Sequence, residues 1–426
     1  MRSDGVRILL QARTLAMATA IAFLLVWLSP DARGETTSPK VDVSRQGDLY
    51  AAGELLVTYE SDVSGQDADR VVEQAKARVD EEISTSDAQL LSFPEVKNEH
   101  AANVREQRLR RAKEALERDP DVKHVDYNYL RMATLVPNDP AYVNELQWNL
   151  DIIGAPAAWD ETLGKGARVA VVDTGIAGHH PDLESKIVAQ KDVINNDDVA
   201  QDDSRGESEG HGTHVAGTVG AVTNNGEGVA AVCPSCRLLV AKSGDSNGLF
   251  FDSDIVQGIY WSVQNRAKAI NLSLGARAES RILEHAVNYA WDHDVVVVAA
   301  AGNHNPSNPN DPKKTNYPAA YKNVISVAAT NQSDKKAVFS NFGKIDVAAP
   351  GVDILSTVPG GGYDTKQGTS MASPHVAALA GLLASQGRSA PEIRNRIQRT
   401  AYDLGAEGKD KYFGWGRIDA SKAVSR

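Results

Sequence analysis

V-A-V-V-D-T-G-I (169–176) is a run of apolar, mostly β-branched residues that ends at an aspartate and a turn. A short apolar run of this kind, closed by a turn signal, is typical of a buried strand. Similar runs recur with helical stretches between them, at 238–240, 269–272, 295–299 and 324–328. The alternation predicts an α/β fold, a mostly parallel, twisted sheet with helices on both faces. Functional residues of such sheets gather after strands, where Asp173 stands.

Two further stretches supply a histidine and a serine among small residues, G-H-G-T-H-V-A-G (210–217) and G-T-S-M-A-S-P-H (368–375). Serine is a weak nucleophile until a base takes its proton, and histidine can accept and return that proton near neutral pH. A buried aspartate orients the imidazole and stabilises the imidazolium. Asp173, His211 and Ser370 are therefore predicted to form a triad, and residues 370–384 a buried central helix.

Residues from about 137 to 426 resemble the subtilisin-like serine proteases (subtilases, peptidase S8), and most closely their thermitase-type branch. The chain order Asp, His, Ser is that of subtilisin. Beyond the three stretches above, the resemblance rests on P-N-D-P (137–140), A-V-T-N-N (221–225), N-L-S-L-G (271–275), V-V-A-A-A-G-N (297–303), D-V-A-A-P-G (346–351) and L-L-A-S-Q-G-R-S-A (382–390). It implies a secreted, monomeric endopeptidase that cleaves proteins and peptides through an acyl-enzyme.

The resemblance also assigns substrate contacts. Asn303 would donate to the oxyanion together with the N–H of Ser370. Substrate would bind as an added strand between the segment Ser273–Gly275 on one side of the cleft and the segment at Gly248 on the other side. The residues implied in substrate binding are Gly248, Ser273, Leu274, Gly275, Ala301 and Gly302. Leu249 and Phe250 stand where the family has small residues. The substrate side chains preferred on this side of the cleft are therefore expected to differ from those of the family.

A structural calcium ion is implied by the same resemblance. Calcium takes six to eight oxygen ligands, with carboxylates usually among them. The implied ligands are the carboxylates of Asp139 and Asp182, the side chain of Asn225 and the carbonyls of Val222, Glu227 and Val229. The acidic stretch 192–203 resembles a second calcium loop, although Asn195 replaces a carboxylate; a solvated acidic loop is the alternative.

Some residues compete with the predicted triad. His214 follows His211 by three residues, and Ser373 follows Ser370 by the same spacing. An H-x-x-H pair could hold zinc, but the glutamate and longer spacing of a zinc-protease motif are missing, so we expect His214 to face the core. Ser373 stands in a first helical turn, where serine caps or packs. The competing functions are a catalytically silent subtilase-like binding protein and a metal-dependent hydrolase using both histidines.

Composition and the N-terminus bear on location and partners. The 426 residues carry a net charge of −11, which argues against nucleic acid as a partner. Basic residues precede the apolar run 15–28, as in a secretory signal peptide over residues 1–34; an uncleaved anchor or a periplasmic location is the alternative. Cys233 and Cys236 suggest a local disulfide on a surface turn, with two free thiols as the alternative.

Residues 35–135 are expected to hold a linker and a small α+β domain ahead of the peptidase domain, 136–426. The pattern predicts strands at 54–59 and 121–129 and charged helices at 69–83 and 103–117. In this position the unit resembles the inhibitor-type (I9-like) propeptide of the family, which implies a folding chaperone and inhibitor. We expect self-cleavage between Asn128 and Val136. The alternative is a stable domain that is never removed.

Overall fold

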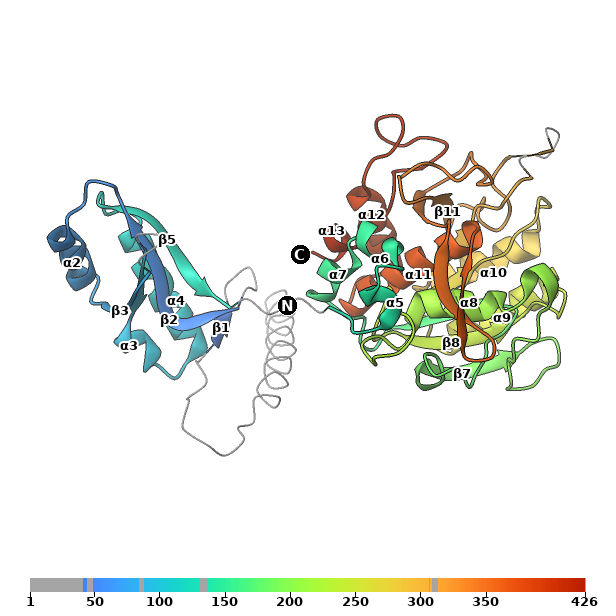
Figure 1. The fold of residues 1–426 in the computed structure, drawn as a ribbon, viewed down its shortest axis with the longest axis horizontal. Helices are drawn as coiled ribbons and strands as arrows, with labels where there is room; N and C mark the ends of the chain where they lie inside the picture. The colour runs from blue at the N-terminus through green and yellow to red at the C-terminus, as the bar shows by residue number, and fades with distance from the viewer. Residues whose placement is uncertain are drawn as a thin grey trace, which may run out of the picture. The chain divides into compact units, whose positions relative to one another are not determined.

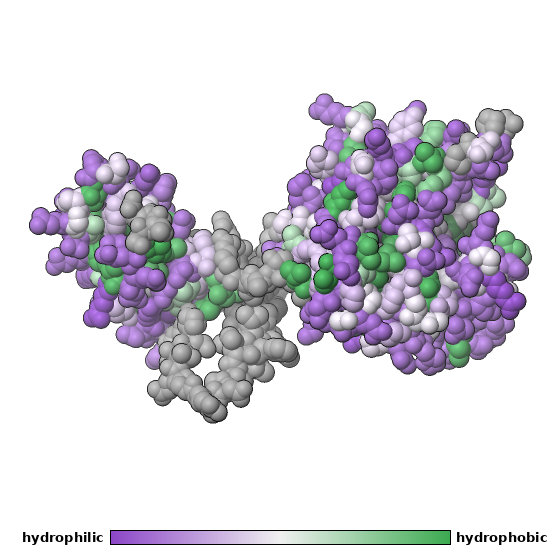
Figure 2. All heavy atoms as spheres, in the orientation of Figure 1, coloured by the Kyte–Doolittle hydropathy of each residue, from purple (hydrophilic) through white to green (hydrophobic). Residues whose placement is uncertain are grey.

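The computed structural model describes residues 41–43, 49–83, 88–130, 136–305, 307–308 and 313–425. The chain divides into two compact units, Met1–Ala133 and Thr134–Arg426 (Figure 1). Hydrophilic residues dominate the face of each unit shown in Figure 2. Among the described residues, no helix has the length and apolar character needed to cross a membrane. The predicted signal peptide, 1–34, and most of the predicted cleavage region lie outside the described residues.

The N-terminal unit is an antiparallel sheet with helices packed on it. Its elements are β1 (Val41–Val43), β2 (Leu49–Tyr59), α2 (Gly65–Gln74), β3 (Arg78–Ile83), β4 (Ala88–Ser92), α3 (Pro94–Lys97), α4 (Ala102–Leu116) and β5 (Val122–Tyr129). The strand order is β1-β2-β4-β3, and β5 pairs with β2. Leu55 on β2 lies opposite Leu91 and Tyr127, and alternate residues of β2 are buried in the core. Both predicted strands and the helix at 103–117 are confirmed.

The helix predicted over 69–83 is wrong in its second half. α2 ends at Gln74, Lys76 has a positive φ of 55°, and β3 begins at Arg78. β3 is an edge strand whose acidic side chains are exposed to solvent, so its charged sequence carries little strand signal. Edge pairing with β4 outweighs the helix propensity of these residues.

The C-terminal unit is built on a seven-stranded sheet in the order β12-β11-β10-β9-β6-β8-β7, and every neighbouring pair is parallel. Its strands are β6 (Arg168–Asp173), β7 (Ile187–Asp192), β8 (Arg237–Lys242), β9 (Ala269–Leu272), β10 (Val296–Ala300), β11 (Val324–Thr330) and β12 (Val347–Pro350). A separate antiparallel hairpin contains β13 (Ile354–Val358) and β14 (Gly362–Lys366). The predicted parallel α/β fold and its five predicted strands are confirmed.

Helices cover both faces of this sheet. They are α5 (Pro140–Val143), α6 (Trp148–Ile152), α7 (Ala155–Trp159), α8 (His211–Gly220), α9 (Asp252–Gln264), α10 (Arg281–Asp292), α11 (Thr369–Ser385), α12 (Ala390–Thr400) and α13 (Ala420–Val424), with 3₁₀ turns at Glu184–Lys186 and Gly206–Ser208. Successive residues of β6 enter two different cores. One core packs against α8 and α11, and the other against α9 and α10. The small side chains of α11 are almost all buried, as predicted for a central helix.

The two cysteines form the expected disulfide, but not on a surface turn. Cys233 and Cys236 are fully buried, in the core that includes α11. A Cβ added to Gly381 of α11 would lie only 2.7 Å from the sulfur of Cys236. The small residues of the central helix therefore leave the space that the disulfide fills.

Candidate active site

The parallel sheet brings the predicted site residues to one edge. β6 ends at Asp173, β9 is followed by Ser273, and β10 is followed by Ala301 to Asn303. β9 lies between β6 and β10, so the carboxyl ends of these neighbouring strands open on the same edge. Ligands of open α/β sheets bind outside this edge.

Asp173 and His211 meet through a hydrogen bond of 2.7 Å between Oδ1 and Nδ1. Asp173 is fully buried, and Thr174 N donates to the same oxygen at 2.8 Å. Burial alone lowers the pKa of His211, but the charge and hydrogen bond of Asp173 and the charge of Asp202 raise it above its ordinary value. A Cβ at Gly212 would lie 2.3 Å from the carbonyl oxygen of Gly175, which explains why glycine follows the histidine.

Ser370 is the second residue of α11 and lies next to the end of β9. Its Oγ donates to Ser273 O at 3.1 Å, and Ser273 Oγ donates to Ser370 O at 2.7 Å. Asn271, whose role sequence reasoning missed, and Ser373 extend this contact: Asn271 Nδ2 donates to Ser273 Oγ at 2.9 Å, and Ser373 Oγ donates to Asn271 Oδ1 at 2.7 Å. Ser373 is thus a buried packing residue, and this relay fixes the backbone that carries Ser370.

Thr369, which sequence reasoning also missed, orients Asn303. Thr369 N and Oγ1 both donate to Asn303 Oδ1, at 3.0 and 2.9 Å. Gly302 N donates to Thr369 Oγ1 at 3.1 Å. Because the carbonyl end of the Asn303 amide is held by Thr369, its NH₂ end remains the donor on the side facing Gly368. A threonine directly before the predicted nucleophile was the available sequence signal.

The predicted substrate-binding residues fall into two groups. Ser273, Leu274, Gly275, Ala301 and Gly302 lie on the two segments that follow β9 and β10. The side chains of Leu274 and Ala301 are buried, so these positions offer mainly backbone atoms. A Cβ at Gly302, where φ is +99°, would lie 2.6 Å from Asn316 Nδ2, so this wall requires glycine.

Gly248 lies on a separate turn after β8. Its N–H donates to Asp245 O, and Gly244 pairs with Phe250 across the turn. Phe250 packs back against Gly244, whereas Leu249 is 61% exposed. The turn therefore presents Leu249 to solvent and buries part of the Phe250 ring.

The residues predicted to bind calcium come together around two buried carboxylates. Asn225 Nδ2 donates to Asp182 Oδ1 at 2.7 Å, Val229 N donates to Asp182 Oδ2 at 3.0 Å, and Asn224 N donates to Asp139 Oδ2 at 2.8 Å. Asp139 Oδ1 is buried without a hydrogen-bond partner in the described structure. Burial, and to a lesser degree the charge of Asp182, raises the pKa of Asp139. An unpartnered carboxylate oxygen beside a second buried carboxylate fits a cation.

The predicted calcium ligands include two carboxylates, those of Asp139 and Asp182. Over the described parts of the chain, no group of three or more His, Cys, Asp or Glu side chains is placed to hold a metal ion. In the acidic stretch 192–203, Asp192 accepts from Ile194 N, Asn195 N and Asn195 Nδ2. These internal bonds occupy both oxygens of Asp192 and favour a self-supporting loop.

His214 faces the core. It is fully buried, and its Nε2 donates to Ile354 O at 2.9 Å. Burial lowers the pKa of His214 to about 3. The histidine thus stays neutral, and its hydrogen bond links α8 to the β13–β14 hairpin. This contact gives His214 a structural role in place of the zinc-binding role considered above.

Comparison with known proteins decides the family. The model of the peptidase S8 family, described as "Subtilase family", matches residues 164–416, which is more than half of the chain. The chain belongs to the subtilase family. This subtilase is 38% identical to a thermophilic serine proteinase from Bacillus sp. (strain AK1) over 418 residues, covering 97% of this chain and 98% of that protein. It is 46% identical to thermitase from Thermoactinomyces vulgaris, over 68% of this chain and 99% of that protein.

The remaining comparisons concern structure and the N-terminal unit. A solved protease from Pseudoalteromonas arctica PAMC 21717 is similar at a TM-score of 0.61 and 34% identity, covering 68% of this chain and 99% of that structure. Residues 36–128 match the fervidolysin N-terminal prodomain. This subtilase is a serine endopeptidase with a propeptide, and its subtilisin-like fold is confirmed.

Proposed function

We propose that this subtilase hydrolyses peptide bonds through a triad of Asp173, His211 and Ser370. The observation that carries the proposal is the 2.7 Å bond between buried Asp173 and His211 Nδ1, at the sheet edge that also holds Ser370. The bond leaves Nε2 of His211 as the proton acceptor for the serine. Catalytic hydrogen bonds often tighten only when substrate binds, so Ser370 Oγ would leave Ser273 O at that point.

The reaction follows from these roles. Ser370 Oγ attacks the carbonyl carbon while its proton moves to His211 Nε2. His211 then returns this proton to the leaving amine as the C–N bond breaks, which gives an acyl-enzyme. Water attacks the ester with His211 again as base, and the serine is regenerated. Asp173 stays ionised throughout and stabilises the imidazolium.

Charge that develops on the carbonyl oxygen needs donors. Asn303 Nδ2 and the backbone N–H of Ser370 would supply them, with Thr369 holding the amide in the donating orientation. Substrate would add as a strand between Gly248 and Ser273–Gly275, next to the wall at Ala301 and Gly302. Leu249, exposed at the rim, would contact substrate residues upstream of the scissile bond.

A serine-directed fluorophosphonate tests the triad. We expect one irreversible label, located on Ser370 by peptide mapping, and loss of both label and activity in Ser370→Ala. A silent binding protein would not label. Inhibition by a chelator that zinc reverses and calcium does not would instead favour a metal-dependent hydrolase using His211 and His214.

We further propose that the N-terminal unit chaperones folding of the peptidase domain, inhibits it and is then removed by self-cleavage between Asn128 and Val136. The prodomain match to residues 36–128 supports this assignment. Residues 1–34 would direct export before this step. N-terminal sequencing of the mature enzyme checks the position, and a mature protein that still begins before residue 128 would contradict it.

Calcium would stabilise the mature N-terminus. Asp139, Asp182 and Asn225, with the carbonyls of Val222, Glu227 and Val229, would hold the ion, and the unpartnered Asp139 Oδ1 supports the fit. A bound ion would neutralise the two buried carboxylates, and its ligands would connect residues 139–140 to the 222–229 loop. A chelator should lower Tm in wild type and have little further effect in Asp139→Asn; equal Tm with and without chelator would contradict the proposal.

A further inference from the structure

The helix that begins at the catalytic histidine has no cap of its own. α8 spans His211–Gly220, and its N-cap position is Gly210, which has no side chain to accept a hydrogen bond. The first N–H groups of a helix have no partner inside it and need acceptors from elsewhere. His211 is the first residue of α8, so whatever holds this first turn also holds the imidazole.

A buried carboxylate eleven residues away accepts from this turn. Asp202 Oδ2 accepts from Thr213 N at 2.9 Å and from Thr213 Oγ1 at 2.6 Å. Gly210 N donates to Ser204 Oγ at 3.0 Å, and Ser204 Oγ donates to Asp202 Oδ1 at 2.5 Å. Asp202 therefore satisfies one N–H of the first turn directly and another through a hydroxyl.

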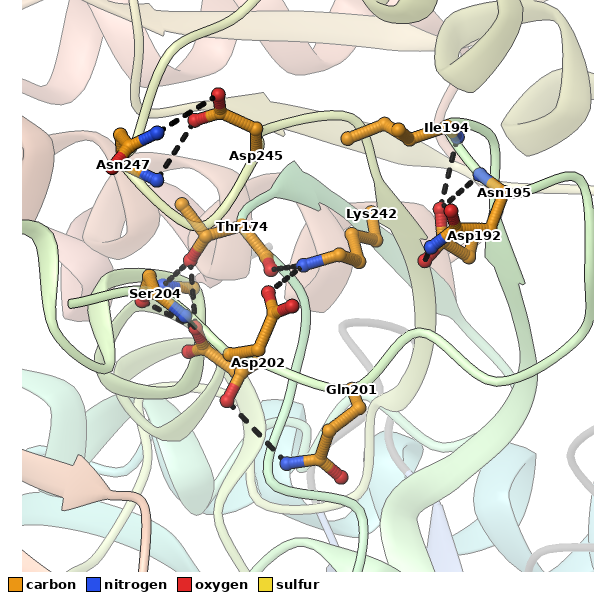
Figure 3. A network of polar contacts seen from close by, with 12 residues as sticks. Thr174, Asp192, Ile194, Asn195, Gln201, Asp202, Ser204, Lys242, Asp245 and Asn247 are labelled. Carbon is orange, nitrogen blue, oxygen red and sulfur yellow. Dashed lines mark hydrogen bonds and ion pairs between the residues drawn. The ribbon is translucent and has the colours of Figure 1, made fainter.

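A second hydroxyl relay connects the same carboxylate to the triad aspartate. Gly212 N donates to Thr174 Oγ1 at 2.9 Å, and Thr174 Oγ1 donates to Asp202 Oδ1 at 3.1 Å. Thr174 N in turn donates to Asp173 Oδ1. Figure 3 shows Asp202 next to Thr174 and Ser204, with dashed contacts converging on its carboxylate. One side chain thus holds the residues on both sides of the Asp173–His211 bond.

The charge of Asp202 is left largely unneutralised by this arrangement. Its partners in the described chain are hydroxyl and N–H groups, whereas the neighbouring Asp203 forms an ion pair with Lys242. Lys242 Nζ also donates to Thr174 O at 3.0 Å (Figure 3). Asp202 is only 5% exposed, so solvent screens its charge weakly.

The charged groups around His211 come from several elements. Asp173 at the end of β6 and Asp202 before α8 favour the imidazolium, whereas Lys366 on β14 opposes it. His214, one turn along α8, is neutral because burial lowers its pKa to about 3. Asp202 is thus a second negative charge acting on the base.

We propose that Asp202 is a positioning residue for the catalytic histidine: it caps α8 from a distant loop, locks Thr174 and Thr213 around the Asp173–His211 bond, and stabilises the protonated imidazole that forms during acylation. The inference rests on the proposed triad. It adds a fourth side chain, which touches neither substrate nor the reacting atoms.

The test compares mature wild type, Asp202→Asn and Asp198→Asn with a chromogenic peptide, measuring kcat and KM across the acid limb of the pH profile. Asp198 is in the same loop, and its 89% exposed side chain makes it the matched charge control. In Asp202→Asn we expect kcat to fall about tenfold or more, because small displacements of a base are costly. KM should stay within about twofold, and the acid limb should move to lower pH. Asp198→Asn should match wild type.

An acid limb at the wild-type pH in Asp202→Asn overturns the proposal, whatever happens to Tm, because a purely structural role would change stability alone. Fluorophosphonate labelling in parallel separates this failure from failure of the triad: label on Ser370 with an unmoved limb rejects Asp202 only. If Asp202→Asn does not fold, Thr213→Val and Thr213→Ser replace it. We expect kcat of the valine variant to be about tenfold below that of the serine variant, which keeps the hydroxyl; equal values overturn the proposal.

Discussion

The histidine end of the proposed triad lies among buried charges, whereas the serine end is held by neutral hydroxyl and amide groups. Asp173 and Asp202 surround the first turn of α8. Around Ser370 the supporting groups are Ser273, Asn271 and Thr369. The difference matches the chemistry, because positive charge develops on the imidazole, while the oxyanion needs fixed donors and no competing carboxylate.

The largest effect is expected at the charged end. Asp173→Asn removes the charge that stabilises the imidazolium and permits the wrong imidazole tautomer, so kcat should fall about 10⁴-fold with the fold intact. Steady-state kinetics of the mature variant, with near-UV circular dichroism as the folding check, measure this. A variant within tenfold of wild type would show that the buried charge is not needed.

The neutral end should respond less strongly. Asn303→Ala removes one oxyanion donor, so kcat should fall about 10²–10³-fold while KM changes little. Thr369→Ser keeps the hydroxyl that orients the amide and serves as the matched control. If KM rose and kcat held, Asn303 would bind ground-state substrate instead of the transition state.

A third expectation concerns a buried neutral histidine at the serine end. His375 is fully buried on α11, and burial lowers its pKa to about 4 despite the hydrogen bond to Met371 O. The unfolded chain binds a proton below about pH 6.5, so the stability contributed by neutral His375 is lost as pH falls from about 6.5 toward 4, at about 1.4 kcal/mol per pH unit.

Urea unfolding in the Ser370→Ala background, at pH 7 and pH 5, measures this loss. His375→Gln should reduce the loss between the two pH values by about 2 kcal/mol. The exposed His285 offers the control, since His285→Gln should leave it unchanged. The same pH dependence in both variants would mean that His375 does not stay neutral in the fold.

The smallest effect is expected far from both ends. Arg266 follows α9 with a φ of +64° and donates its N–H to Val263 O. Glycine adopts this helix-ending conformation without strain, so Arg266→Gly should raise the free energy of unfolding by about 0.5–1 kcal/mol and leave kcat unchanged. Thermal unfolding and peptide kinetics check both halves of this expectation, and a loss of stability would mean that the Arg266 side chain contributes contacts.

Local sequence was enough to predict those elements whose residue types themselves determine the structure. The β-branched runs predicted β6 and β9 because buried parallel strands need them, and the small residues of 370–384 predicted a central helix. Local sequence failed at β3, where pairing at a sheet edge decides the structure of charged residues. It could not find Asp202 or Asn271, because their partners lie on other segments and only the fold brings them together.

The most direct test of the central claim is the intact mass of wild type and Ser370→Ala after incubation with calcium. We expect loss of about 130 N-terminal residues in wild type only, because the proposed self-cleavage requires the enzyme's own serine. Full-length protein in both samples would contradict self-processing, and identical trimming in both would contradict the role of Ser370.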